Sequence, residues 1–201
     1  MSGVLREMDC KEEIVPVSGY RSLPEQEKIY LESLRNNGAE FTQKYVALPG
    51  HSEHQTGFAI DLGVKKDNMD FICPAFPYEG ICNEFRKVAP EYGFIQRYQK
   101  GKERITGISH EPWHFRYVGY PHSKIISEES MSLEEYIYAV KNYTYGRKSL
   151  KVRSGNQCIE IAYVPLLQKE NMDISLPDDG YYQISGNNED GFIITRWREV
   201  I

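Results

Sequence analysis

Two short stretches, SEHQTGFAID at residues 52–61 and EPWH at residues 111–114, carry most of the information in this 201-residue chain. The first places His54 seven positions before Asp61, and the second places Glu111 three positions before His114. Two imidazoles and a carboxylate form a suitable ligand set for Zn²⁺ that leaves a fourth position open. A glutamate beside the last ligand is suited to accept a proton from a metal-activated water. The pattern therefore predicts a zinc hydrolase.

Both stretches are expected to lie on strands of one sheet. Residues 58–63 form a short apolar run between two glycines, which is typical of a buried strand. Asp61 in such a run is costly to bury as an ion unless a cation offsets its charge. Pro112 excludes the helix on which His-Glu-x-x-His zinc sites are built, and the aromatic content of residues 113–118 favours a strand. The ligands are therefore expected to converge across strands.

Histidines that are not ligands are common, so each half of the pattern is weak by itself. His51 and His110 flank the two stretches, and either remains an alternative ligand. The joint pattern is more specific, because Ser52, Gly57 and Ala59 are interleaved with the expected ligands.

The joint pattern Ser-x-His-x-x-Gly-x-Ala-x-Asp followed by Glu-x-x-His resembles the VanX, VanY and VanXY group of zinc D,D-peptidases. This family includes D-Ala-D-Ala carboxypeptidases of cell-wall metabolism. Residues 18–22 with Gln26 resemble the family's upstream Gly-Tyr-Arg-Ser…Gln element. Residues 47–50 and 111–119 are most similar to the bifunctional VanXY and the VanY types. The resemblance covers about residues 12–145.

The resemblance also implies roles for individual residues. A surface salt bridge for Arg21, a solvated helix face for Gln26 and a core position for Trp113 remain alternatives to those roles. The implied assignments are zinc ligation by His54, Asp61 and His114, general base catalysis by Glu111, oxyanion stabilisation by Arg21, and substrate binding by Ser52, Gln26 and Trp113.

The expected fold is α+β, with a central antiparallel sheet that carries the zinc site and is flanked by helices, as in D,D-peptidases and hedgehog-like proteins. Strands are expected at 13–17 and 94–98 in addition to the two motif strands. Helices are expected from Ser22 to Gly38 and over 79–92 and 132–145, each with a start or stop signal. The loop 64–78 is expected to border the active-site mouth, because loops of that length are often functional.

A change of composition after Gly146 predicts two domains, a catalytic domain over 1–146 and a small β-rich module over 147–201. In the module, residues 158–164 read as a strand, and 181–184 with 192–197 read as a hairpin. A structural cap, a homodimer surface and a substrate- or wall-binding role are all open for this module.

Composition excludes several other classes of protein. The net charge is −5 and there is no basic run, so nucleic acid is not expected as a partner. No apolar stretch approaches the roughly 18 residues that span a bilayer, and no signal peptide is visible, so a cytoplasmic location is expected. Only about a dozen residues precede the first expected strand, so an upstream pocket contact or membrane anchor is left open. The four cysteines are expected as free thiols, with a bridge or metal role for Cys73 and Cys82 as the alternative.

The resemblance implies a peptidase that acts on D-Ala-D-Ala or on peptidoglycan precursors ending in it, and so contributes to glycopeptide (vancomycin) resistance. The alternatives are a peptidoglycan-remodelling D,D- or L,D-carboxypeptidase and a non-catalytic zinc-folded binding protein. Glu111 and Arg21 argue against the binding protein, since neither is needed to hold a metal. The balance between dipeptidase and carboxypeptidase activity depends on how open the pocket is.

Overall fold

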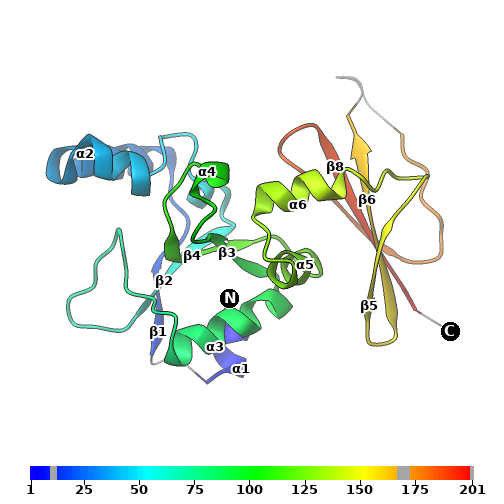
Figure 1. The fold of residues 1–201 in the computed structure, drawn as a ribbon, viewed down its shortest axis with the longest axis horizontal. Helices are drawn as coiled ribbons and strands as arrows, with labels where there is room; N and C mark the ends of the chain where they lie inside the picture. The colour runs from blue at the N-terminus through cyan, green and yellow to red at the C-terminus, as the bar shows by residue number, and fades with distance from the viewer. Residues whose placement is uncertain (10–12, 167–172, 200–201) are drawn as a thin grey trace. The chain divides into compact units, whose positions relative to one another are not determined.

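Four strands form an antiparallel sheet in the N-terminal part of the chain, in the order β1-β2-β4-β3 (Figure 1). The computed structural model describes residues 1–9, 13–166 and 173–199. The strands of this sheet are β1 (Ile14–Ser18), β2 (Ala59–Val64), β3 (Phe94–Tyr98) and β4 (Glu111–Tyr117). The sequence-based prediction of an α+β fold with a central antiparallel sheet is confirmed.

Strand β1 forms one edge of this sheet and, among the residues that the structure describes, pairs with β2 alone. Pro16 lies opposite Leu62, a position that suits an edge strand because proline has no N–H to donate. The register shifts between Pro16 and Ser18, so Ser18 comes to lie opposite Asp61. This irregularity places a hydroxyl next to one of the expected metal ligands.

The two faces of the sheet are used differently. Leu62 and Phe115 pack on one face in a core to which helices α1 (Ser2–Glu7) and α3 (Gly80–Val88) contribute Val4 and Phe85. Successive side chains in a strand point to opposite faces, so Asp61 and His114 point away from this core. Helix α2 (Leu23–Tyr45) supplies residues to the cavity on the Asp61 side, away from α1 and α3 (Figure 1). The site therefore lies between the sheet and α2.

Helix α2 begins and breaks at residues that the sequence predicts. Glu25 accepts hydrogen bonds from the backbone N–H and the hydroxyl of Ser22, which caps the first turn. Gly38 has φ 82° and ψ 171°, so the helix breaks there as expected. The chain then returns to a helix up to Tyr45, which the sequence analysis did not predict.

Several short elements connect the strands. The predicted helix over 79–92 is α3 followed by a 3₁₀ turn, η2 (Ala89–Tyr92). Helix α1 and helix α5 (His122–Glu128) were not predicted, and neither was α4 (Glu103–Thr106) between β3 and β4. The long loop 65–78 is irregular, and its Ala75 carbonyl accepts the N–H of Val64 beyond the part of β2 that pairs with β4.

The C-terminal part contains a second four-stranded antiparallel sheet, in the order β5-β6-β8-β7. Its strands are β5 (Leu150–Ser154), β6 (Gln157–Pro165), β7 (Tyr181–Gly186) and β8 (Gly191–Glu199). The predicted hairpin is β7–β8, and the predicted strand over 158–164 is β6. At the hairpin turn, Asn187 Oδ1 accepts the N–H groups of Glu189, Asp190 and Gly191.

The compact units divide at 132/133. Helix α6 (Leu133–Val140) packs against β6 and so belongs to the C-terminal unit, although the sequence placed the change of composition after Gly146. The assignment of 1–146 as the catalytic domain stays a prediction.

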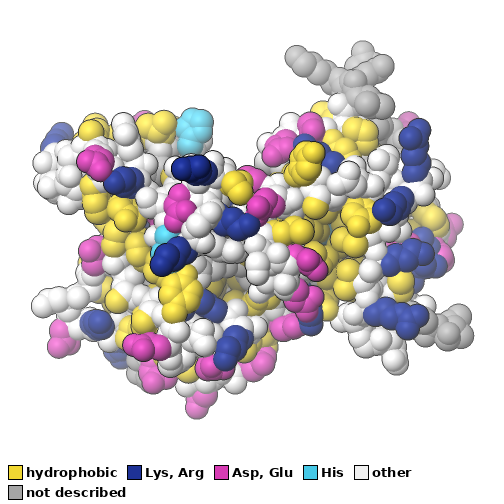
Figure 2. All heavy atoms as spheres, in the orientation of Figure 1, with side chains coloured by type: hydrophobic (Ala, Val, Ile, Leu, Met, Phe, Trp, Pro, Cys, Tyr) yellow, Lys and Arg dark blue, Asp and Glu magenta, His cyan; other side chains and the backbone are white. Residues whose placement is uncertain are grey.

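Cys73, Cys82 and Cys158 are free thiols, as expected, and Cys10 lies outside the described residues. None of the helices in the described ranges combines the length and the hydrophobicity needed to cross a membrane. On the face shown in Figure 2, acidic and basic side chains are interspersed.

Candidate metal and catalytic site

The structure brings the three expected ligands together on the open face of the first sheet. Asp61 on β2 and His114 on β4 are directly opposite in the register, so their side chains leave the sheet on the same side. His54 comes from the 3₁₀ turn η1 (Glu53–Thr56) that precedes β2. One ligand atom from each of the three lies within 4.8 Å of the others, and all three residues are buried.

The alternative ligands lie elsewhere. His110 stacks on the ring of Tyr78, and its Nε2 lies 2.6 Å from the Tyr78 hydroxyl. His51 is exposed. Within the described residues, neither is part of the His54–Asp61–His114 group.

The orientation of His54 fits a bound cation. Its Nδ1 lies 2.7 Å from the carbonyl oxygen of Gly19, so Nδ1 carries the proton and donates it. In the neutral ring, Nε2 then has only a lone pair, yet it faces Asp61 Oδ2 at 3.2 Å. Two acceptors at this distance need a positive charge between them. A metal ion held by both satisfies that need, and the donor types suit zinc.

The charges of the ligand cluster respond to burial and to one another. Burial alone would raise the pKa of Asp61, but its interactions with His114 and His54 outweigh burial and hold this pKa well below its usual range. Burial lowers the pKa of His54. Burial also opposes a charge on His114, but its interactions with the carboxylates of Asp61 and Glu53 raise its pKa to about 9. The cluster therefore keeps Asp61 anionic and ready to bind a cation.

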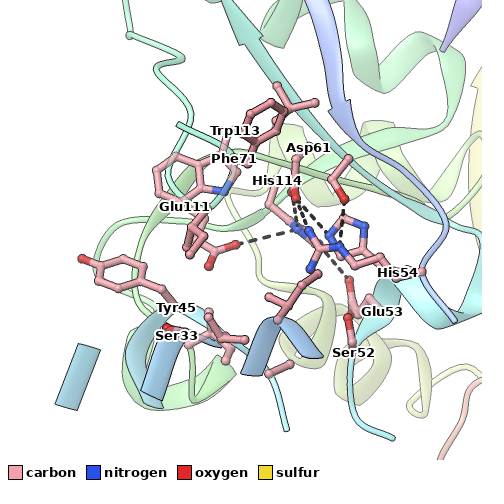
Figure 3. A pocket seen from close by; sticks show the side chains of 18 of the residues that line it. Ser33, Tyr45, Ser52, Glu53, His54, Asp61, Phe71, Glu111, Trp113 and His114 are labelled. Carbon is pink, nitrogen blue, oxygen red and sulfur yellow. Dashed lines mark hydrogen bonds and ion pairs between the residues drawn. The ribbon is translucent and has the colours of Figure 1, made fainter. Parts of the chain in front are cut away.

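Glu111 lies beside this cluster at the start of β4. Its Oε2 is 3.7 Å from Nδ1 of His114, and only 5% of the residue is exposed (Figure 3). Burial raises the pKa of Glu111 to about 8, although His114 and Arg21 act in the opposite direction. A carboxyl group that titrates near neutral pH can both accept and return a proton, which is what a general base and acid requires.

Arg21 is anchored directly to the ligand cluster. Its Nη2 donates to Asp61 Oδ2 at 2.7 Å, and its Nε donates to the Ser18 hydroxyl at 2.8 Å. Only 16% of its side chain is exposed. The alternative of an exposed surface salt bridge is therefore wrong, and the guanidinium lines the same cavity as Glu111.

The cavity over the cluster has a volume of about 370 Å³. Ser52 and Trp113 line it, and Trp113 also packs in the core. Contact of either residue with substrate stays a prediction. Phe71 and Ile72 of the long loop line it too, which confirms that this loop borders the site. Figure 3 shows Phe71 and Trp113 on the Glu111 side of His114, with Ser52 and Glu53 on the other side.

Gln26 is fully buried, so its interpretation as part of a solvated helix face is wrong. Its Nε2 donates to the carbonyl oxygen of Ala47 at 2.8 Å, and its Oε1 accepts from Arg21 Nη1 at 3.4 Å. Both ends of the amide thus contact the protein. A direct contact of Gln26 with substrate stays a prediction.

Glu53 is the residue at this site that the sequence analysis did not single out. Its Oε1 accepts from Arg97 Nε at 2.9 Å, and its Oε2 lies 3.5 Å from His114 Nε2. Burial acts to raise the pKa of Glu53, but His114 and Arg97 lower it to about 2. No local sequence signal identifies it, because Arg97 is 44 positions away.

A buried histidine–aspartate–histidine cluster with an adjacent glutamate, on the open face of an antiparallel sheet, is the arrangement of a metal-dependent hydrolase. Comparison with known proteins identifies the family within this class of hydrolases. The family model of VanY, D-alanyl-D-alanine carboxypeptidase, matches residues 6–120. The chain belongs to this family and is a peptidase.

Three similar proteins have closely related descriptions. The bifunctional D-Ala-D-Ala dipeptidase and D-Ala-D-Ala carboxypeptidase VanXYC of Enterococcus gallinarum is 48% identical over 66% of this chain and 70% of its own length. The vancomycin resistance D,D-dipeptidase VanXYg, solved with a D-Ala-D-Ala phosphinate analog, superimposes with a TM-score of 0.95. It is 56% identical, over 98% of this chain and 78% of that one. A mutant of the D,D-pentapeptidase VanY from a VanB-type cassette, solved with Zn(II), gives a TM-score of 0.53 at 30% identity, over 68% of this chain and 80% of that one.

Proposed function

We propose that this chain is a zinc-dependent D,D-peptidase that cleaves D-Ala-D-Ala, the C-terminal D-Ala of peptidoglycan-precursor pentapeptides, or both. The observation that carries the proposal is the convergence of His54, Asp61 and His114, with Glu111 Oε2 at 3.7 Å from the last ligand. The similarity to VanXYC and VanXYg supports the choice of substrate.

The metal would be held by His54, Asp61 and His114, with no protein ligand needed at the fourth position. When bound, zinc would polarise the scissile carbonyl and lower the pKa of a water molecule. The metal complex of the VanY mutant supports zinc as the ion.

The chain's own groups supply the remaining chemistry. Glu111 would take a proton from the attacking water and return it to the leaving amine, a role supported by its contact with His114 and its raised pKa. Arg21 would stabilise negative charge on the carbonyl oxygen, a role supported by a guanidinium that lines the cavity and stays charged. Ser52 and Trp113 would contact the peptide from the cavity wall.

Removal of D-Ala-D-Ala ends from precursors would leave fewer targets for glycopeptide antibiotics, so the biological role would be resistance to vancomycin. The proposed site of action is the cytoplasm, where precursors are made. A homodimer through the C-terminal module stays a prediction.

The test compares steady-state rates on three substrates: free D-Ala-D-Ala, a pentapeptide ending in D-Ala-D-Ala, and a tetrapeptide whose last bond joins an L- to a D-residue. The zinc-loaded protein should cleave one or both D,D substrates and lose activity on chelation. Cleavage of the tetrapeptide alone would instead identify an L,D-carboxypeptidase. Tight zinc binding with no cleavage of any substrate would identify a binding protein.

A further inference from the structure

Glu53 is a partly buried carboxylate that the proposed chemistry does not use. It is the first residue of η1, directly before the ligand His54, and 16% of its side chain is exposed. Its Oε1 is fixed by Arg97 Nε at 2.9 Å, and Arg116 Nη1 lies 3.7 Å from its Oε2. The two arginines come from neighbouring strands, β3 and β4. They hold the carboxylate in one orientation.

That orientation directs Oε2 toward the far side of the His114 ring. Nε2 of His114 lies 3.5 Å from Glu53 Oε2, and both atoms are buried. Across the part of the chain that the structure describes, neither atom has a hydrogen-bond partner that would compete with the other. The opposite ring nitrogen, Nδ1, lies 2.9 Å from Asp61 Oδ1 and 3.7 Å from Glu111 Oε2. Each nitrogen of this ring therefore faces its own carboxylate.

The two nitrogens of a neutral imidazole have different hydrogen-bonding roles. One carries the proton and donates it, and the other offers a lone pair. Nδ1, 2.9 Å from Asp61 Oδ1, is the ring nitrogen on the side of the other expected ligands, so a metal bound among them would take the lone pair of Nδ1. The ring proton would then remain on Nε2, toward the Glu53 carboxylate at 3.5 Å. Carboxylates placed behind ligating histidines in this way orient the ring and increase its basicity.

We propose that Glu53 is a positioning residue that holds His114 as its Nε2–H tautomer, so that Nδ1 is the metal-binding atom. The proposal rests on the zinc-peptidase function proposed above, because it assigns a role toward that metal. Arg97 serves the same role indirectly, by fixing the carboxylate that contacts the ring.

A purely structural role is the competing explanation. Glu53 could simply neutralise Arg97 and Arg116, whose side chains are 9% and 11% exposed. Such a role predicts a loss of stability when Glu53 is replaced, but no change in the tautomer of His114 and no selective loss of metal affinity. The two roles are therefore separable by measurement.

The experiment measures zinc affinity by competition with a chromophoric chelator in the full chain and in Glu53→Gln. The variant keeps the size of the side chain but removes its charge. We expect zinc binding to weaken by about 10- to 100-fold, the effect typical of lost partners behind ligating histidines. Glu91→Gln is the matched control, since Glu91 is exposed and pairs with Lys124 at 2.7 Å. Its zinc affinity should equal that of the parent, and thermal unfolding should show that both variants are folded.

Nitrogen-15 NMR of the histidine rings supplies a second measurement, on the unmodified zinc-loaded chain. The Nε2 of His114 should carry the proton and Nδ1 should show the shift of a metal-bound nitrogen. Metal at Nε2 would overturn the proposal even if Glu53→Gln did not fold. Equal zinc affinity in parent and Glu53→Gln would also overturn it, while leaving the peptidase function intact. Failure of the parent chain to bind zinc would instead contradict the proposed function itself.

Discussion

The two units of this chain each contain a four-stranded antiparallel sheet, but the glutamates on the two sheets differ in how many cationic side chains surround them. On the C-terminal sheet, Glu160 is met by Arg198 at 2.8 Å, Arg196 at 3.3 Å and Lys151 at 3.4 Å. On the N-terminal sheet, Glu111 is buried, and its basic neighbour His114 is 3.7 Å away. A carboxylate surrounded by cations is electrostatically satisfied. One buried with little compensation has a raised pKa and can move protons.

The comparison shows that sheet architecture alone does not create the site. Both sheets are antiparallel and both carry acidic and basic residues. Only the N-terminal sheet, among the described residues, brings two histidines and an aspartate within ligand distance. Function in this chain therefore depends on which side chains the register brings together.

The most direct test of this difference between the two sheets is to remove the charge of each glutamate. Glu111→Gln keeps the shape of the side chain but cannot accept a proton, so kcat should fall by about 10²–10⁴ while zinc content stays unchanged. Glu160→Gln is the matched substitution on the other sheet and should leave kcat unchanged. Loss of zinc in Glu111→Gln would mean that this residue is a ligand and not a base.

Arg21 tests whether a cation at the site acts in catalysis or only pairs with Asp61. Arg21→Ala should lower kcat by about 10²–10³ with a smaller change in KM, because the proposed charge on the carbonyl oxygen exists only in the transition state. Arg21→Lys should restore only part of the rate, since lysine lacks the planar fork that reaches Asp61 and Ser18 together. A loss of zinc affinity without a loss of kcat in the loaded enzyme would show that Arg21 serves only to hold Asp61.

Acid sensitivity should also differ between the units, because all five histidines precede Ser132. Burial lowers the pKa of His122 to about 4. The unfolded chain binds this proton near pH 6.5, so the stabilisation present above that pH is lost as the pH falls from about 6.5 to about 4. Between roughly pH 7.5 and pH 5, the free energy of unfolding should fall by about 2 kcal/mol from this residue.

Each unit contains one tryptophan, Trp113 or Trp197, so fluorescence can follow them separately. In a Trp197→Phe background, the fluorescence of Trp113 follows unfolding of the N-terminal unit in denaturant. Adding His122→Gln to this background should abolish the acid-induced loss of about 2 kcal/mol in the free energy of unfolding. Trp113→Phe reports the C-terminal unit, whose unfolding should not respond to His122→Gln. An unchanged pH dependence in the N-terminal unit would contradict the assignment.

The smallest effect is expected from removing the C-terminal sheet. All proposed ligands and catalytic residues lie between Arg21 and His114, so a chain ending at Gly146 should still bind zinc and cleave the free dipeptide. A chain ending at Ser132 tests the boundary seen in the structure. Folding of 1–146 but not 1–132 would support the boundary predicted from composition. Soluble, zinc-loaded chains of both lengths that are inactive would show that the C-terminal residues complete the site.

Much of the candidate site could be predicted because the expected ligands come in short motifs. The glycines around 58–63 and the proline at 112 define the strands, and strand register then brings Asp61 and His114 together. Pocket lining by Ser52 and Trp113 followed from the same motifs. Local sequence predicts the site well here because each motif contains both the expected ligand and the glycine or proline residues that determine its backbone conformation.

Other features depend on partners that are distant in the sequence. Gln26 lies on an ordinary polar stretch of helix, and its burial follows from the carbonyl of Ala47, 21 positions later. The sequence around Glu53 gives no sign that its side chain is largely shielded from solvent, because that depends on its contact with Arg97, 44 positions later. Helices α1 and α5 are short, at six and seven residues, so they carry little periodicity to detect.

Pro16 has a consequence for the behaviour of the whole chain in concentrated solution. An edge strand with free N–H groups is a template on which another chain can add a strand and begin to aggregate. The N–H of Lys65 donates to the carbonyl oxygen of Glu13, so the backbone of residue 13 faces β2. Pro16 lies an odd number of residues further along the strand, so its nitrogen is directed away from β2. Proline there removes the donor that an incoming strand would need. The β1 edge, beside the expected ligand Asp61, is thereby protected against strand addition, and Pro16→Val should make the protein more prone to aggregate without altering the site.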